Sequence, residues 1–206
     1  MTVNEHISVT EYAGGVSVID ADFHREHMAG CYLVEAGSEV AFIEVGTNSS
    51  TPRLMSVLQA RGWRPEDVRY VIVTHVHLDH AGGAGSLMQL LPDAELLVHP
   101  YGARHMIDPA KLEAGARAVY GDEMFDEVYG TLIPVSEERV RIMEEGDEVT
   151  LGNRRLRFTD TPGHARHHFC VHDDLTNGWF TGDSFGLSYR EFDTQNGAFV
   201  LPTTTP

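Results

Sequence analysis

The sequence predicts an α/β fold in which strands and helices alternate in the first half and short strands gather in the second. Apolar, β-branched runs separated by glycine-containing turns recur near the N-terminus. A later run is apolar throughout, and the strand pattern returns after a helical stretch. With 206 residues, 42% of them hydrophobic and 22% charged, residues 1–206 are expected to form a single domain.

The first half is predicted to contain three strands and then a helix. The strands are Val16–Asp20, Cys31–Glu35 and Val40–Val45. The helix is expected over Pro52–Arg61, with Thr51 as its N-cap and proline at its first position, because proline is tolerated there. Gly62 is expected to end it.

The run Tyr70–Thr74 is apolar from end to end, which is typical of a strand buried on both faces. A helix around Ser86–Leu91 and a strand over Glu95–His99 are expected to follow. From about 101 to 130 the pattern becomes helical and irregular, which indicates an insertion into the domain.

After the insertion the strand patterns resume with Gly, Asp and Asn turns between them. They cover Arg139–Met143, Glu148–Leu151, Arg154–Thr159, His168–His172 and Gly178–Thr181. We expect a second, mostly antiparallel sheet here, with almost no helix.

Charge and cysteine usage exclude several classes of function. A formal charge of −16 repels phosphate backbones and anionic lipid, so neither nucleic acid nor a membrane surface is an expected partner. Cys31 and Cys170 each lie in an apolar run and are expected to be buried free thiols of a reducing compartment. We find neither a signal-peptide pattern nor a membrane-spanning run, and a cytoplasmic protein is expected.

The strongest chemical signal follows the apolar strand directly. His75, His77, Asp79 and His80 lie within six residues, and the first two point to the same side of an extended segment. Asp79 and His80 come one bend later and can face a second point nearby. Imidazole nitrogen and carboxylate oxygen are ligands that zinc favours and that iron or manganese also accepts. A polar loop without metal is the alternative that four such residues at this spacing argue against.

The pattern His75-x-His77-x-Asp79-His80 resembles the signature of the metallo-beta-lactamase superfamily. Two later segments, Thr161–His164 and Phe180–Asp183, resemble that family's third ligand loop and its bridging-aspartate loop. The resemblance covers roughly residues 16–185 and implies a four-layer αββα sandwich. It also implies one metal ion held by His75, His77 and His164. A second ion would be held by Asp79 and His80, with Asp183 bridging both.

The sequence departs from that family in its last part. Members usually have one more histidine for the second metal, whereas no histidine follows His172 here. The second half also lacks the helices that would cover its sheet. We therefore expect a shortened fold, whether an engineered fragment, a truncated gene or a form that a partner completes, with a weak or open second metal site. A homo-oligomer that covers the incomplete second half is one such form.

We expect two divalent cations at this site, zinc first, with iron or manganese as alternatives. Such a pair predicts hydrolysis of an ester, thioester, lactone or similar bond of a small molecule. Asp79 is the expected catalytic residue, orienting the attacking water and passing a proton to the leaving group. Two alternatives stay open. One is an iron-containing oxygen-binding protein or oxygenase of the same superfamily, and the other is a truncated metal-binding module without enzymatic activity.

Three further side chains are expected to contact substrate. Tyr101 and His105 would do so from the insertion, which is a candidate lid. His168 follows the third ligand loop and is expected either to contact substrate or to pack at the base of the site.

Overall fold

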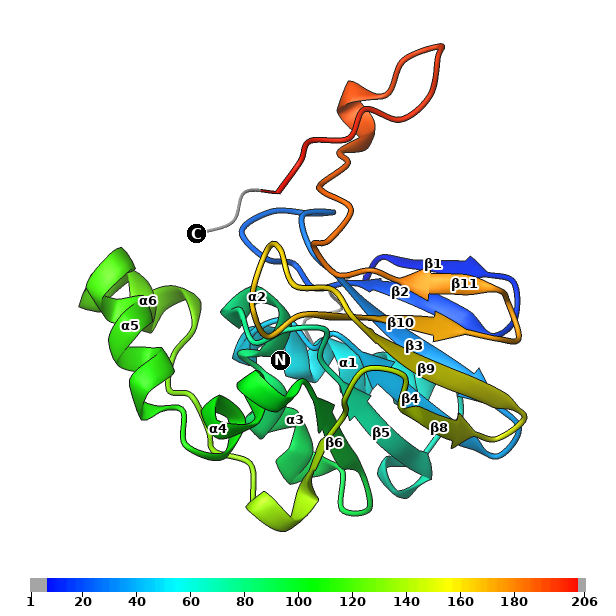
Figure 1. The fold of residues 1–206 in the computed structure, drawn as a ribbon, viewed down its shortest axis with the longest axis horizontal. Helices are drawn as coiled ribbons and strands as arrows, with labels where there is room; N and C mark the ends of the chain where they lie inside the picture. The colour runs from blue at the N-terminus through cyan, green and yellow to red at the C-terminus, as the bar shows by residue number, and fades with distance from the viewer. Residues whose placement is uncertain (1–6, 204–206) are drawn as a thin grey trace.

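The computed structural model describes residues 7–203 and contains two sheets packed face to face. The larger sheet has the order β1-β2-β3-β4-β5-β6-β7, antiparallel from β1 to β4 and parallel from β4 to β7. The smaller sheet has the order β11-β10-β9-β8 and is antiparallel throughout. Figure 1 shows the helices on one side of the larger sheet and the smaller sheet on its other side.

The larger sheet consists of β1 Val9–Tyr12, β2 Val16–Asp20, β3 Gly30–Ala36, β4 Glu39–Ile43, β5 Val68–Ile72, β6 Glu95–Val98 and β7 Val140–Ile142. The smaller sheet consists of β8 Glu148–Leu151, β9 Arg154–Asp160, β10 Phe169–Asp173 and β11 Gly178–Phe180. The strands expected from the sequence are therefore present within one or two residues at most ends. The exposed edge strand β1 was not predicted.

The prediction for Arg139–Met143 was wrong about its sheet. Its strand, β7, pairs in parallel with β6 in the larger sheet instead of joining the antiparallel one. The chain reaches β7 through the helical segment after β6, and a crossover of that kind returns a strand parallel to its neighbour.

The helices are α1 Thr51–Ala60, α2 Leu78–Ala81, α3 Ala84–Leu90, α4 Pro100–Ile107, α5 Ala110–Tyr120 and α6 Asp122–Val128. Gly62, with φ +82°, follows the end of α1 as expected. The predicted N-cap is wrong, because Thr51 is the first helical residue and Ser50 precedes it at the end of a 3-10 turn, Asn48–Ser50. That turn supplies the first bend, so the cap lies one residue earlier.

Alternate residues of the central strands face two separate cores. Phe42 and Val71 pack with the helices in one core, whereas Ile43 and Ile72 pack against the smaller sheet in the other. Because both faces of β4 and β5 are covered, their sequences are apolar at almost every position. This explains why the run ending at Thr74 could be recognised as a buried strand.

The outer face of the smaller sheet carries no helix among residues 7–203. Leu156 and Phe158 of β9 are fully buried against the larger sheet, whereas Arg155 and Arg157, which alternate with them, are exposed. The described chain thus shows three layers of the αββα arrangement, one of helices and two of strands. Nor does any described helix have the length and apolar character needed to cross a membrane.

The segment from 100 to 128 holds α4, α5 and α6, and Figure 1 shows α5 and α6 standing to one side of the sheets. A small core ties this segment to the histidine motif. Phe125 and Tyr129 pack on Leu78, which lies between His77 and Asp79. Movement of this segment would therefore displace Leu78 and the loop that carries the histidine motif.

Candidate metal centre

The motif begins where β5 ends, at the rim of the larger sheet. His75 is fully buried, and His77 immediately precedes the short helix α2, which carries Asp79 and His80. The third loop follows β9 and brings His164 to the same place, and the loop after β11 brings Asp183. Strand ends of both sheets thus position the six predicted ligands as one group.

Three imidazoles meet at one point, which we call the three-histidine cluster (His75, His77 and His164). The Nε2 atom of His75 lies 3.1 Å from Nδ1 of His77, which lies 2.9 Å from Nε2 of His164. Nitrogens about 2.0–2.1 Å from a tetrahedral zinc ion lie about 3.3 Å from one another. The separations therefore fit one bound ion with a position left open.

The second cluster consists of Asp79, His80 and Asp183. The Nε2 atom of His80 lies 3.4 Å from a carboxylate oxygen of Asp79 and 3.4 Å from Oδ1 of Asp183. The other oxygen of Asp183, Oδ2, lies 3.4 Å from Nε2 of His164 in the first cluster. One carboxylate therefore faces both clusters, as a group that bridges two cations must.

Glu44, which was not predicted from the sequence, contacts the second cluster through His80. Its Oε1 atom accepts a hydrogen bond from the Thr74 backbone N–H at 2.6 Å, and its Oε2 atom accepts one from Nδ1 of His80. Glu44, His75 and His80 also lie close enough together to form a potential ligand group. Because both Glu44 oxygens are already bonded, we assign it to orienting His80, so that Nε2 of His80 faces the site.

The structure places His168 beneath the site rather than at a substrate surface. It is fully buried, its Nε2 atom accepts the Asp183 backbone N–H at 3.2 Å, and its Nδ1 atom lies 2.9 Å from the Thr161 hydroxyl. Gly182 allows this contact, because a Cβ there would lie 2.7 Å from His168 Nε2. Of the two expected roles, packing at the base matches this placement, and the substrate contact does not.

The two other expected substrate contacts, Tyr101 and His105, lie on α4. Tyr101 is 64% exposed and stacks obliquely on His99, and His105 accepts a hydrogen bond from its neighbour Arg104. Neither residue lines the cavity beside the second cluster.

The protonation states of the two clusters differ. Burial and the surrounding imidazoles hold the pKa values of His75 and His77 below the ordinary range, which keeps them neutral and able to bind a cation. Burial opposes the charge of His80, yet the carboxylates of Glu44, Asp183 and Asp79 raise its pKa well above the usual value. Three carboxylates around one imidazole are an excess of negative charge that a cation would neutralise.

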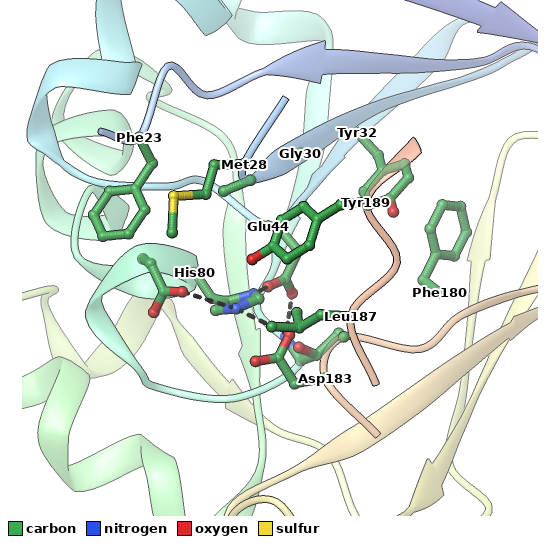
Figure 2. Close-up of a pocket in the computed structure, with 14 residues that line it drawn as sticks. Phe23, Met28, Gly30, Tyr32, Glu44, His80, Phe180, Asp183, Leu187 and Tyr189 are labelled. Carbon is green, nitrogen blue, oxygen red and sulfur yellow. Dashed lines mark hydrogen bonds and ion pairs between the residues drawn. The ribbon is translucent and has the colours of Figure 1, made fainter. Parts of the chain in front are cut away.

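A cavity opens beside the second cluster, and Figure 2 shows Glu44, His80 and Asp183 at its floor. Its walls come from the loop between β2 and β3, from β3 itself, and from the chain at and after β11. These walls could not be predicted from the sequence, because their side chains come from two distant segments, residues 23–32 and 180–189.

The comparison with family models decides the classification. Residues 25–201 match the model described as the metallo-beta-lactamase superfamily. The chain belongs to this superfamily. The match includes both clusters, and it confirms the resemblance and the fold class expected from the sequence.

Several members are similar to this chain over much of its length. The metallo-beta-lactamase fold-containing protein ST1585 of Sulfurisphaera tokodaii is 37% identical over 142 residues, which cover 66% of this chain and 49% of that protein. Its crystal structure has a TM-score of 0.71 and 31% identity, covering 95% of this chain and 70% of that one. The acyl-coenzyme A thioesterase MBLAC2 of Homo sapiens is 28% identical over 190 residues, covering 82% of this chain and 63% of that protein.

The N-acyl homoserine lactonase of Bacillus cereus is 31% identical over 116 residues, covering 56% of this chain and 37% of that protein. The chain thus spans about half the length of the curated relatives that it matches. The thioesterase and the lactonase are both hydrolases by name, and the histidine and carboxylate groups of this chain could hold metal ions.

Proposed function

We propose that this protein is a metal-dependent hydrolase that uses two divalent cations, with zinc as the expected metal, to cleave an ester, thioester or lactone bond of a small molecule. The observation that carries the proposal is the Asp183 carboxylate, which faces the three-histidine cluster through one oxygen and His80 through the other. Relatives named as a thioesterase and a lactonase support the same class of bond.

The three-histidine cluster would hold the first cation through nitrogens that lie 2.9–3.1 Å apart. Asp79 and His80 would hold the second, with Asp183 shared between the two. When bound, the cations would lower the pKa of a water molecule toward neutrality and polarise the carbonyl group under attack. The second cluster offers three protein ligands within the described chain, which leaves room for water or substrate.

The chain's own residues would prepare this chemistry in three ways. Glu44 accepts a hydrogen bond from Nδ1–H of His80 and thereby leaves Nε2 free to face the site. His168 fixes the backbone at Asp183. The Asp79 side chain is 35% exposed beside the cavity, so its carboxylate can accept a proton from water and deliver it to the leaving group.

The test is a screen of neutral esters, thioesters and lactones with protein that has been purified, stripped of metal by a chelator and reloaded. We expect hydrolysis by the loaded protein, loss of hydrolysis on stripping, and recovery with zinc. Hydrolysis that survives complete metal removal would contradict the proposal. Mostly iron in the purified protein, with an oxygen-sensitive visible band, would instead favour oxygen chemistry.

A further inference from the structure

The cavity beside the second cluster has an acidic floor and apolar walls. Its volume is about 200 Å³. Six large apolar or aromatic side chains line it, namely Phe23, Met28, Tyr32, Phe180, Leu187 and Tyr189. Figure 2 shows these side chains around the space in front of Glu44 and His80. Such a surface gains free energy by excluding water from an apolar ligand group.

Contacts behind the walls hold several of these side chains in place. The rings of Tyr32 and Phe180 meet edge to face with centroids 5.1 Å apart, which joins the larger sheet to the smaller one. Phe23 packs against Tyr129, which belongs to the small core at Leu78. Met28 and Leu187 are each 37% exposed and stand where the cavity opens. The inner part of the cavity is therefore built into the fold, and its rim is adjustable.

The walls of the cavity offer no positive charge to an anionic ligand group that lies away from the second cluster. Its charged lining residues are the carboxylates Glu44, Asp79 and Asp183, besides His80, and none of the described residues lining it is lysine or arginine. Arg25 lies against the Tyr189 ring, 5.1 Å from its centroid, but is not part of the lining and pairs with Glu191 at 3.2 Å. With the acyl carbonyl at the cations, a carboxylate at the other end of the chain would lie among the apolar walls, where it would lose water without gaining a partner cation.

We infer that this cavity binds the uncharged, apolar acyl group of the substrate, about six to eight carbon atoms long. An apolar cavity of about 150 Å³ accommodates benzene, and this cavity is somewhat larger. The inference rests on the proposed function only for the bond that is cleaved. Water would supply the hydroxyl of the acid product, the bond from the acyl carbon to oxygen or sulfur would break, and the leaving alcohol or thiol would take the remaining proton.

The expected selectivity follows from burial of the acyl chain. Each added methylene should raise kcat/KM about fourfold until the cavity is full, because burying one contributes about 0.8 kcal/mol. Beyond about eight carbons the gain should stop. A hexanoyl ester should be preferred over the matched adipoyl ester, which ends in a carboxylate, by at least about a hundredfold.

Binding can be tested without any turnover, by methyl NMR of protein labelled at its methionines and titrated with hexanamide. We expect the Met28 methyl resonance to shift and that of Met124, exposed on α6, to stay unchanged. Adipamic acid, which has the same length and a terminal carboxylate, should shift neither. An unmoved Met28 resonance would overturn the inference whatever the enzymatic result.

The substitution Met28→Arg places a cation at the mouth of the cavity, and Met124→Arg is its matched control. Met28→Arg should lower the preference for hexanoyl over adipoyl esters at least tenfold, and Met124→Arg should leave the preference unchanged. An equal preference in both variants would refute the inference. Ester hydrolysis without any acyl preference would refute the acyl-binding inference but support the proposed function. Hexanamide binding without any hydrolysis would support the acyl-binding inference but contradict the proposed function.

Discussion

Replacing Glu44 by glutamine preserves the shape of the side chain but removes its ability to accept two hydrogen bonds. The carboxylate accepts one from the Thr74 backbone N–H and one from Nδ1 of His80. The two bonds end on different oxygens, and in glutamine one of these positions is an NH2 group, which donates and cannot accept. Because the backbone N–H cannot move its proton, His80 must adapt, and its proton shifts from Nδ1 to Nε2. The nitrogen that faces Asp79 and Asp183 would then be blocked.

The magnitude follows from one hydrogen bond to a buried charged group. Glu44 is 3% exposed, and such a bond contributes about 1.5–3 kcal/mol, or roughly 10–150-fold in affinity. Outer hydrogen-bond partners of metal ligands have effects of about 10–100-fold. Glu44→Gln should therefore weaken the second cation by one to two orders of magnitude and leave the cation at the three-histidine cluster nearly unaffected.

The assay is titration of metal-stripped protein with zinc against a competing chelator, fitted to two affinities. Glu35→Gln is the matched control, because Glu35 also accepts a short hydrogen bond, from Trp63 at 2.6 Å, but pairs with Arg61 instead of with a residue of either cluster. Equal loss in both variants would mean a general effect on folding. Two unchanged affinities in Glu44→Gln would refute the assignment of Glu44 to His80.

Three further predictions follow from individual contacts. Asp79→Asn keeps a side-chain oxygen that can bind a cation, so it should keep most of the bound metal and lower kcat about 10²–10⁴-fold. Unchanged turnover in an esterase assay would show that Asp79 does not transfer the proton. Arg154→Met should lower the free energy of unfolding in urea by about 3–5 kcal/mol, because it leaves the fully buried Asp173, 2.8 Å away, without its cation. Adding Asp173→Leu should restore much of this free energy. A loss below about 1 kcal/mol in Arg154→Met would contradict the prediction. Burial and the neighbouring His164 lower the pKa of His168 to about 4, so the unfolded chain binds the proton first and metal-free protein should lose stability as the pH falls from about 6.5 toward 4. His168→Gln, which cannot titrate there, should flatten that slope in urea unfolding, and an unchanged slope would argue against it.

The sequence predicted every strand among the described residues except β1, and the group His75 to His80, because each of these leaves a local pattern. Buried central strands are apolar at consecutive positions, as in β5, and ligand residues follow strand ends at fixed short spacings. His164 and Asp183 lie in short loops after strands, and the family resemblance assigned them to the same site as His75. The structure brings all of these side chains to one edge of the two sheets.

What could not be predicted depends on contacts between distant segments. The strand pattern of Val140–Ile142 resembles its later neighbours, and only its parallel pairing with β6 assigns it to the larger sheet. Glu44 did leave a trace, as a carboxylate in an otherwise apolar run, but its partner His80 lies 36 residues further on. The position of His168 at the base of the site depends on its burial, and hence on how Thr161 and Asp183 pack around it.

In the proposed function, the two adjacent clusters bind one cation each. The most direct measurement is the number of zinc ions per chain, by plasma mass spectrometry, in protein equilibrated with zinc and then freed of unbound metal. We expect close to two ions in the wild type and close to one in His77→Ala and in His80→Ala, each of which loses a ligand of a different cluster. One ion or none in the wild type, or two in either variant, would contradict the claim.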